Sequence, residues 1–377
     1  MALRILGVSF AAAGFLAGTL PASAIEPDAV AKALGAAIIK GANVSASYDA
    51  AHTEGDNVVV DGLTITRLST EQTLRFDKIV VASPAESDKG VFQSPLISFA
   101  SGTLSGDSNG TIDAATVTDA VVLDASKLAG DALGESILFA SAEVNGIHVS
   151  RQAEPGEVSI GRIAIESGNL LGDLAQDSKG KAENVTLSPD LFPTGVFAPA
   201  SFGYDNLALD VSWDSSRDVA AKTMTIRDFT VDIHEGGELS ITGVMGNLPD
   251  PRILDDAGAA TKASNAEVHQ LTVRYRDNSL AGRVLDALAK RQGLTRSEYT
   301  QQLNAALPFL LLTLNNPAFQ TQVTAAVKGF LENPQSLTIS LDPDVPVSGS
   351  DIMSLLKSNP AIVPDRLKAS VTANASE

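Results

Sequence analysis

A short pattern recurs along this chain: an alternating apolar strand is interrupted by two polar or turn-prone residues, then resumes with its apolar residues on the other parity. In the first copy, Val58 and Val60 precede Asp61-Gly62, and Leu63 and Ile65 follow it. Four further copies have their central dipeptides at Asn145-Gly146, Asp205-Asn206, Arg227-Asp228 and His269-Gln270. Such repetition is typical of folds that bury a core by stacking similar units. The pattern therefore constrains the architecture and carries no chemistry of its own.

The central dipeptide is compatible with two local structures. Asp-Gly and Asn-Gly favour two-residue hairpin turns, because both turn residues need a positive φ. Arg227-Asp228 and His269-Gln270 lack that preference, yet they occupy the same place in the pattern. We therefore favour a parity switch inside one continuous strand, where a bulge or bend redirects the side chains. A sheet bent at each copy is expected to curl into a trough or a flattened barrel.

The period of two extends from Val44 to Tyr275, with turn clusters between the alternating runs, and this indicates a long antiparallel sheet. Two strands with their connections take roughly 16 to 24 residues, so regular spacing in that range predicts an out-and-back pair of strands per unit. Four apolar-x-apolar cores recur at intervals of 22 residues, which lies within that range. They begin at Ile163, Val185, Leu207 and Phe229.

The segment 1–24 has the features of a cleaved secretory signal. Arg4 precedes a small and apolar run from Ile5 to Leu20, and Ala22-Ser23-Ala24 has the spacing of a signal peptidase site. The alternative is a retained membrane anchor, but the run is shorter than the roughly 20 residues that a span needs. An exported chain without cysteine fits a bacterial periplasmic protein, with secretion as the alternative. No stable transmembrane anchor is expected after signal removal.

The remaining chain divides by periodicity into two predicted domains. Residues 25–275 are expected to hold a leading helix over 26–40 and the β-repeat domain, and residues 276–377 a C-terminal helical module. In that module a capping box at Thr295 and Glu298 begins the second of three helices. Closing strands are predicted over 337–341 and 367–371, around a short helix over 351–357. The predicted fold is mainly β: a long curved antiparallel sheet of repeated bent strands, capped by helices.

The net charge argues against polyanionic partners. Without the signal, 26 basic residues minus 45 acidic residues give a charge of −19. Nucleic acids and anionic membrane surfaces are bound by clustered Lys and Arg, so we expect no nucleic-acid partner.

Recognisable catalytic, cofactor or metal motifs are absent from the sequence. His52, His148, His234 and His269 have none of the close ligand spacings of metal sites, and no phosphate-binding glycine loop occurs. We therefore predict no catalytic, cofactor or metal residues and a protein that is not an enzyme. A hydrolase remains an alternative, because paired carboxylates at a suitable separation need no local motif. Three such pairs occur: Asp210 with Asp214, Asp255 with Asp256, and Asp342 with Asp344.

Two groups of apolar residues are candidates for lining a core or an apolar ligand. The first group consists of inward strand positions of the bent sheet, namely Leu207, Leu209, Phe229, Val231, Leu271 and Val273. The second is Phe309 and Leu310, in the most apolar run of the mature chain, Pro308–Leu312. We expect that run to form a core helix, with a lipid-facing role as the alternative.

Two stretches carry a family resemblance. Asp228–Gly243 is a strand, a glycine turn and a strand that ends in Thr-Gly, and Leu271–Leu280 leads into a leucine-rich helix that ends at Gly293. They resemble exported bacterial envelope proteins of the YdgA-like and AsmA-like groups, over about a third of the chain. The resemblance implies an envelope protein with a long curved sheet and, for AsmA-like relatives, an apolar groove associated with phospholipid movement. Those relatives keep a membrane anchor and are longer, and the resemblance brings no catalytic residues.

These observations predict a periplasmic, non-enzymatic envelope protein that binds lipid or another apolar envelope component along a curved sheet. A structural or protein-interaction role with a filled β core is the alternative, and an envelope protein would then be the partner. The hydrolase on paired carboxylates is the second alternative.

Overall fold

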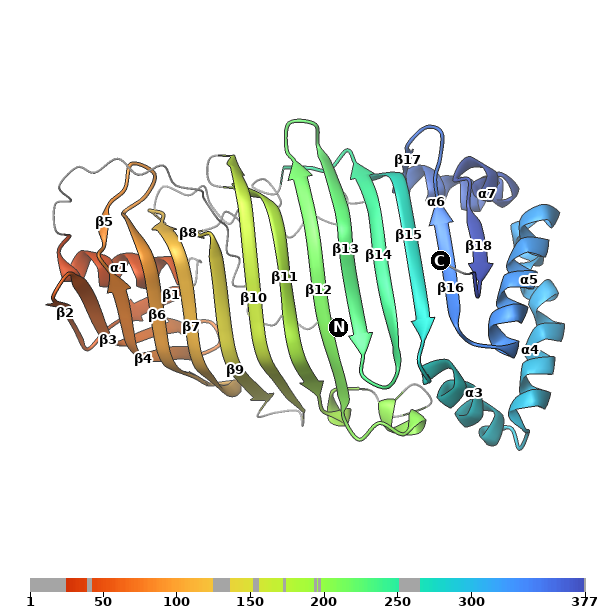
Figure 1. Ribbon diagram of the computed structural model, residues 1–377, viewed down its shortest axis with the longest axis horizontal. Helices are drawn as coiled ribbons and strands as arrows, with labels where there is room; N and C mark the ends of the chain where they lie inside the picture. The colour runs from red at the N-terminus through yellow and green to blue at the C-terminus, as the bar shows by residue number, and fades with distance from the viewer. Residues whose placement is uncertain are drawn as a thin grey trace. The chain divides into compact units, whose positions relative to one another are not determined.

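The computed structural model describes residues 25–38, 43–124, 136–151, 156–171, 174–192, 195, 198–250 and 265–375. The expected signal segment lies outside the described residues. The chain forms two compact units, one of Met1–Leu187 with Pro251–Asp255 and one of Ser188–Asp250 with Asp256–Glu377. Both are built on antiparallel strands, and the helices after β15 belong to the second unit (Figure 1). The prediction of a mainly β chain with C-terminal helices is therefore confirmed.

The first unit has one helix and a sheet in which every pair of neighbours is antiparallel. Both β1 and β2 pair with β3, and the order then runs through β4, β6, β7, β9 and β10 to β11. No pairing joins β2 to β11 among the described residues, so this sheet is an open trough. Its elements are α1 (Pro27–Ile38), β1 (Val44–Ser47), β2 (Ala50–Glu54), β3 (Asn57–Arg67), β4 (Gln72–Ala82), β5 (Ala85–Glu86), β6 (Phe92–Ser105), β7 (Ser108–Val122), β8 (Ile137–Leu138), β9 (Ser141–Arg151), β10 (Glu157–Leu171) and β11 (Leu174–Leu187).

A line of local kinks crosses this sheet from strand to strand. The pairs Asp61–Lys78 and Leu63–Phe76 keep one register and leave Gly62 opposite Asp77. The same geometry continues across the sheet, with a positive φ on every second strand. The apolar residues of each strand change parity at this line, so those on both sides of it face the same core. The kink line, in strand order from β3 to β11, consists of Gly62, Asp77, Ser101, Asp113, Gly146, Gly161 and Asn184.

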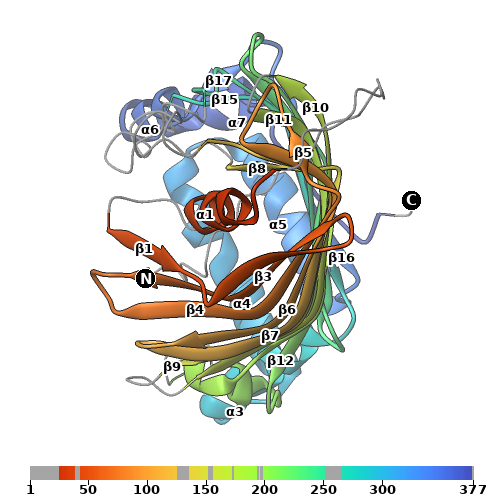
Figure 2. The ribbon, with the colours of Figure 1, turned by 90° about the vertical axis from the view of Figure 1, so that its left-hand side faces the viewer.

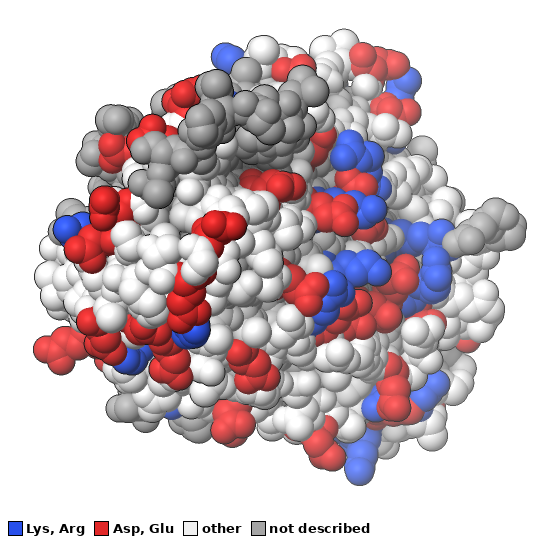
Figure 3. Space-filling view, turned by 60° about the vertical axis from the view of Figure 1, so that its left-hand side comes forward, with Lys and Arg blue, Asp and Glu red and all other residues white. Residues whose placement is uncertain are grey.

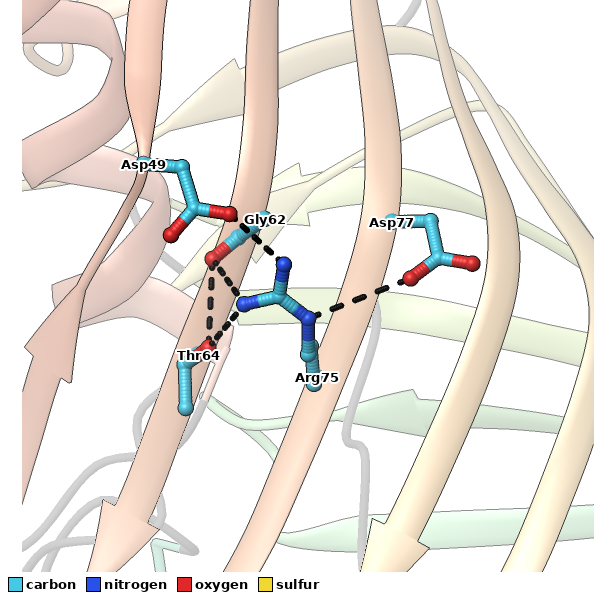
Figure 4. Close-up of polar contacts among 5 residues, drawn as sticks. All are labelled: Asp49, Gly62, Thr64, Arg75 and Asp77. Atoms are coloured by element: carbon cyan, nitrogen blue, oxygen red, sulfur yellow. Dashed lines mark hydrogen bonds and ion pairs between the residues drawn. The ribbon is translucent and has the colours of Figure 1, made fainter.

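The kink at Gly62 is held by a side-chain network (Figure 4). Gly62 has a φ of 62°, and its carbonyl accepts hydrogen bonds from the Arg75 guanidinium (3.1 Å) and the Thr64 hydroxyl (3.1 Å). Arg75 also pairs with Asp49 at 2.7 Å, which raises the pKa of Arg75 through that hydrogen bond. A Cβ on residue 62 would lie 2.1 Å from an Asp49 oxygen. The position therefore requires glycine for its conformation and for its space.

Helix α1 fills the concave side of the first unit, where the strands curve around it (Figure 2). Its buried face carries Val30 and Leu34 at helical spacing, and both are fully buried. They pack into one cluster with Val60, Leu63 and other strand residues. The prediction of a leading helix packed on the sheet is confirmed, and the core of this unit is filled by protein side chains.

The second unit has a smaller sheet followed and interrupted by helices. Its strands pair in the order β12, β13, β14, β15, β16 and β18, with β17 beside β15. None of the described helices is both long and apolar enough to cross a membrane. The elements are η1 (Pro189–Leu191), η2 (Pro199–Phe202), β12 (Leu207–Asp218), β13 (Thr223–Ile233), β14 (Gly237–Gly246), β15 (Glu267–Asp277), α3 (Leu280–Arg291), α4 (Arg296–Leu311), η4 (Leu312–Leu314), α5 (Pro317–Glu332), β16 (Ser336–Leu341), β17 (Val347–Ser348), α6 (Gly349–Ser358), η5 (Pro360–Ile362), α7 (Val363–Arg366) and β18 (Ser370–Ala373).

The recurring dipeptide is a parity switch within one strand in four of its five copies. Asp61-Gly62 and Asn145-Gly146 lie at the kink line, inside β3 and β9. In the second unit, register shifts leave Arg227 as an additional residue in β13 and His269 in β15, and these are β-bulges. For the fifth copy the predicted parity switch is wrong, because Asp205-Asn206 lies in a bend that precedes β12.

Three expectations about spacing and element boundaries differ from the structure. The regularly spaced cores lie on consecutive single strands, β10 to β13, and not on out-and-back pairs. The reason is strand length: β10 alone has 15 residues, well above the usual 5 to 6 or so. The expected boundary at 275 falls inside the second unit, because β16 pairs directly with β15. The last strand, expected over 367–371, is β18 and begins later, because Leu367 ends helix α7.

Substituting Gly62 tests the steric part of the kink. Gly55 has the same φ of 62° but open space around its missing side chain. Gly55→Ala carries only the left-handed backbone cost of about 1–2 kcal/mol, whereas Gly62→Ala must also displace Asp49 and should lose roughly 3 kcal/mol or more. Urea unfolding of both variants measures the difference, and equal losses would show that the Asp49 contact is unimportant.

Truncating Leu34 tests whether α1 is part of the core. Leu34→Ala leaves a cavity at a fully buried site and should cost about 2–5 kcal/mol of unfolding free energy. Lys32→Ala, on the exposed side of the same helix, should cost less than about 0.5 kcal/mol. Similar unfolding midpoints for the two variants would mean that α1 does not pack on the sheet.

Candidate functional site

One face of the sheet in the second unit is apolar across five strands. Cross-strand partners in an antiparallel pair lie on the same face, and the register joins Val211 to Val231, Val231 to Leu239, and Leu239 to Tyr275. We call this surface the apolar face. Its residues are Leu207, Leu209, Val211, Trp213, Phe229, Val231, Ile233, Leu239, Ile241, Leu271, Val273, Tyr275, Leu337, Ile339 and Leu341.

The bulges keep this face apolar although the sequence changes parity. Past the Arg227 bulge, Ile226 and Met224 pair with Ser215 and Arg217, which lie on the same side of β12 as Trp213. Past the His269 bulge, Val268 pairs with Met245, on the side of Ile241. An apolar residue that would otherwise point to the opposite side is thus returned to the apolar face.

The opposite face is largely polar at the paired positions. Ion pairs and hydrogen bonds connect its side chains, including Asp210 with His234 (3.0 Å), Asp214 with Arg227 (2.6 Å) and Ser212 with Asp228 (2.8 Å). The Arg227 contact uses the bulged residue. Figure 3 shows the general pattern on one side of the molecule, where basic side chains lie beside acidic ones. This face of the sheet therefore has an ordinary solvated surface.

The apolar face is only partly shielded from water. Phe229 and Leu239 are each 37% exposed and Ile339 is 43% exposed, while the other members are half-buried. In the first unit, by contrast, equivalent strand residues such as Leu63 and Ile79 are fully buried. The difference follows from α1, which covers the first sheet, because among the described helices none packs in the same way over β12, β13 and β14.

Helix α5 covers one end of the apolar face. It packs on β16 and β18, and the Phe330 ring meets Tyr275 edge to face at 6.0 Å between centroids. Burial raises the pKa of Tyr275, and its hydrogen bond to Asp277 (2.6 Å) raises that pKa further. The Tyr275 hydroxyl is thus already hydrogen-bonded, and α5 covers the face at β15 through the Phe330 ring.

The structure brings together the first group of predicted residues and separates the second. Leu207, Leu209, Phe229, Val231, Leu271 and Val273 all lie on the apolar face. Sequence reasoning missed Trp213, Leu239 and Ile339, which the period of two in their own strands identifies.

The expectation of a core helix at Phe309 and Leu310 is wrong. Both lie at the end of α4 and are 73% and 69% exposed. Helix α4 packs on α3 through Tyr299 and Leu303, in its first half. Its last turn extends beyond that contact, so the apolar run remains in water.

Three of the residues considered for catalysis are engaged in surface pairs. Asp210 and Asp214 bind His234 and Arg227, and Asp344 pairs with Lys368. Asp255 and Asp256 lie outside the described residues. Among the residues that the structure describes, no group of three His, Asp or Glu side chains could hold a metal ion. The apolar face is therefore the candidate functional site.

Comparison with known protein families gives a match to part of the second unit. A family model described as an uncharacterized protein matches residues 230–374, from within β13 to the end of β18. No curated protein matches the chain.

Proposed function

We propose that this chain is a non-enzymatic protein of the bacterial periplasm that binds the hydrocarbon part of an envelope lipid on its apolar face. The observation that carries the proposal is the exposure of that face. An antiparallel sheet with one apolar side normally packs that side against another layer, and apolar patches larger than a few hundred Å² on a protein surface usually have a function. Five strands spaced by about 4.8 Å span roughly 19 Å, and Phe229, Leu239 and Ile339 are the most exposed side chains of the face.

The chemistry of the face favours hydrocarbon over a protein surface. Protein interfaces contain about one hydrogen bond per 100–200 Å², and their partners need donors and acceptors. On β12, β13 and β14 the members of the face are aliphatic or aromatic groups such as Val211, Val231 and Leu239, and the polar residues on that side, Ser215 and Arg217, come only at the end of β12. A ligand there gains affinity from apolar contact alone, as an acyl chain does.

The location rests on the sequence. The apolar run before Ala22-Ser23-Ala24 supports export, and the absence of cysteine supports a fold that needs no disulfides in the periplasm. The envelope supplies acyl chains on both sides of that compartment, so ligand and protein would meet there.

Binding can be followed through Trp213, the single tryptophan of the chain and a member of the apolar face. We expect a phospholipid with brominated acyl chains to quench Trp213 fluorescence in delipidated protein. Phe229→Ser combined with Leu239→Ser removes two exposed apolar contacts and should weaken the apparent affinity at least about tenfold. The measurement is a quenching titration, together with mass spectrometry of lipid in the native preparation.

The matched control is Thr242→Ala, on the polar face of β14 beside Leu239 and Ile241. It should bind like the unmodified protein. The proposal fails if the unmodified protein shows no quenching and carries no lipid, or if the control loses as much affinity as the double variant.

A further inference from the structure

A second exposed apolar surface lies far along the chain from the apolar strands, at the tip of the hairpin that α4 and α5 form. Phe309, Leu310 and Leu312 are 73%, 69% and 62% exposed. Large apolar side chains this close together at such exposure are unusual for a surface. We call residues 307–316 the hairpin tip.

The tip is held in place by hydrogen bonds. The buried Asn316 side chain accepts from the Phe319 backbone N–H (3.0 Å) and donates to the Ala361 carbonyl (2.9 Å). Gln320 donates to the Leu311 carbonyl at 2.9 Å. These bonds fix the end of α4 to the start of α5 and to η5. The apolar groups are thus presented on a defined turn that is pinned at both ends.

Neighbouring elements extend the same surface. The Asn316–Ala361 bond brings the tip beside η5, where Ile362 is 42% exposed. Helix α6 contacts η5 in turn and carries Met353 and Leu356 one turn apart, 55% and 40% exposed. The tip therefore lies next to two further elements that carry exposed apolar side chains.

The exposed apolar residues of the tip and of these two elements lie in two stretches without acidic residues, although Asp351 in the first turn of α6 and Asp365 border the second stretch. The chain has 45 acidic residues, yet none occurs in 299–331 or in 352–364. The charged residues there are Lys328, which pairs with Glu332, and Lys357. Carboxylates near a bilayer are repelled by anionic lipids and lose hydration. Their absence from these two stretches in so acidic a protein fits contact with a lipid surface.

We propose that the hairpin tip docks the protein on a lipid bilayer by inserting Phe309, Leu310 and Leu312 shallowly among the lipid head groups and upper acyl chains. The tip is too short to span a membrane. Binding at the membrane interface needs apolar side chains that become buried among the lipids and few charges that the lipids repel. Lys357 adds a modest attraction to anionic lipids. This docking goes beyond acyl-chain binding on the sheet and does not depend on it.

The test is flotation of the purified protein with phosphatidylcholine vesicles, with and without phosphatidylglycerol. The unmodified protein should float with both, and Phe309→Ser combined with Leu310→Ser should reduce the partition coefficient at least about tenfold. Because both side chains are already exposed, this variant should keep its fold, which far-ultraviolet circular dichroism checks. The matched control is Leu68→Ser, in the first unit, where Leu68 is 60% exposed; it should float normally.

A direct measure of insertion uses a single relocated tryptophan. With Trp213→Phe as background, Phe309→Trp should give an emission that shifts to the blue with vesicles and is quenched by lipids labelled near the head group. Leu68→Trp in the same background should not respond. No flotation by the unmodified protein, equal flotation by the double variant, or an unshifted emission from residue 309 would overturn the proposal.

Self-association is the other outcome that would overturn it. If sedimentation shows dimers that Phe309→Ser with Leu310→Ser dissolves, and vesicles do not compete with dimer formation, the tip binds a second copy of the chain. Loss of Trp213 quenching with flotation intact would reject acyl-chain binding alone. Loss of flotation with Trp213 quenching intact would reject bilayer docking alone.

Discussion

The apolar side of an antiparallel sheet must be removed from water, and the two units of this chain meet that requirement differently. In the first unit, α1 lies on the concave side and buries Leu63, Ile65 and their neighbours completely. In the second unit, α5 covers only the end of the sheet near Tyr275, and Phe229 and Leu239 remain in partial contact with water. Each apolar Å² left in water forgoes about 25 cal/mol. The second unit therefore gains less from burial of its apolar side than the first unit does.

Continuity of the apolar sides depends on the kinks and bulges. Without a parity switch, strands as long as β10, with its 15 residues, twist progressively. The kink line through Gly62 and Gly146 changes the direction of every strand at the same level while the register stays constant. The bulges at Arg227 and His269 act strand by strand, because each adds a residue to only one partner. Both devices let long strands bend and still keep their apolar residues on one side.

Much of this architecture can be predicted from the sequence, because the spacing of apolar residues follows from the geometry of the strand or helix that they form. The alternation of Leu207 and Leu209 with polar residues identifies a half-buried strand, and Thr295 with Glu298 forms the predicted capping box. The candidate strand residues come together for the same reason. Strand length was not predictable from spacing, since the interval from Ile163 to Val185 suits one long strand as well as two short ones. The exposure of Phe309 could not be predicted either, because the sequence of an apolar helix end is the same whether or not another element covers it.

Charge placement bears on association between copies of the chain, since exposed apolar surfaces favour it and like charge opposes it. The chain has a net charge of −18, and a charge of that size opposes association between copies of the chain. Carboxylates of β12 lie on the polar face, where Asp210 and Asp214 pair with His234 and Arg227. No acidic residue lies in the segment from 299 to 331. Repulsion between copies therefore acts through the surfaces that are not apolar. The apolar face and the hairpin tip stay open to uncharged hydrocarbon, which that repulsion does not exclude.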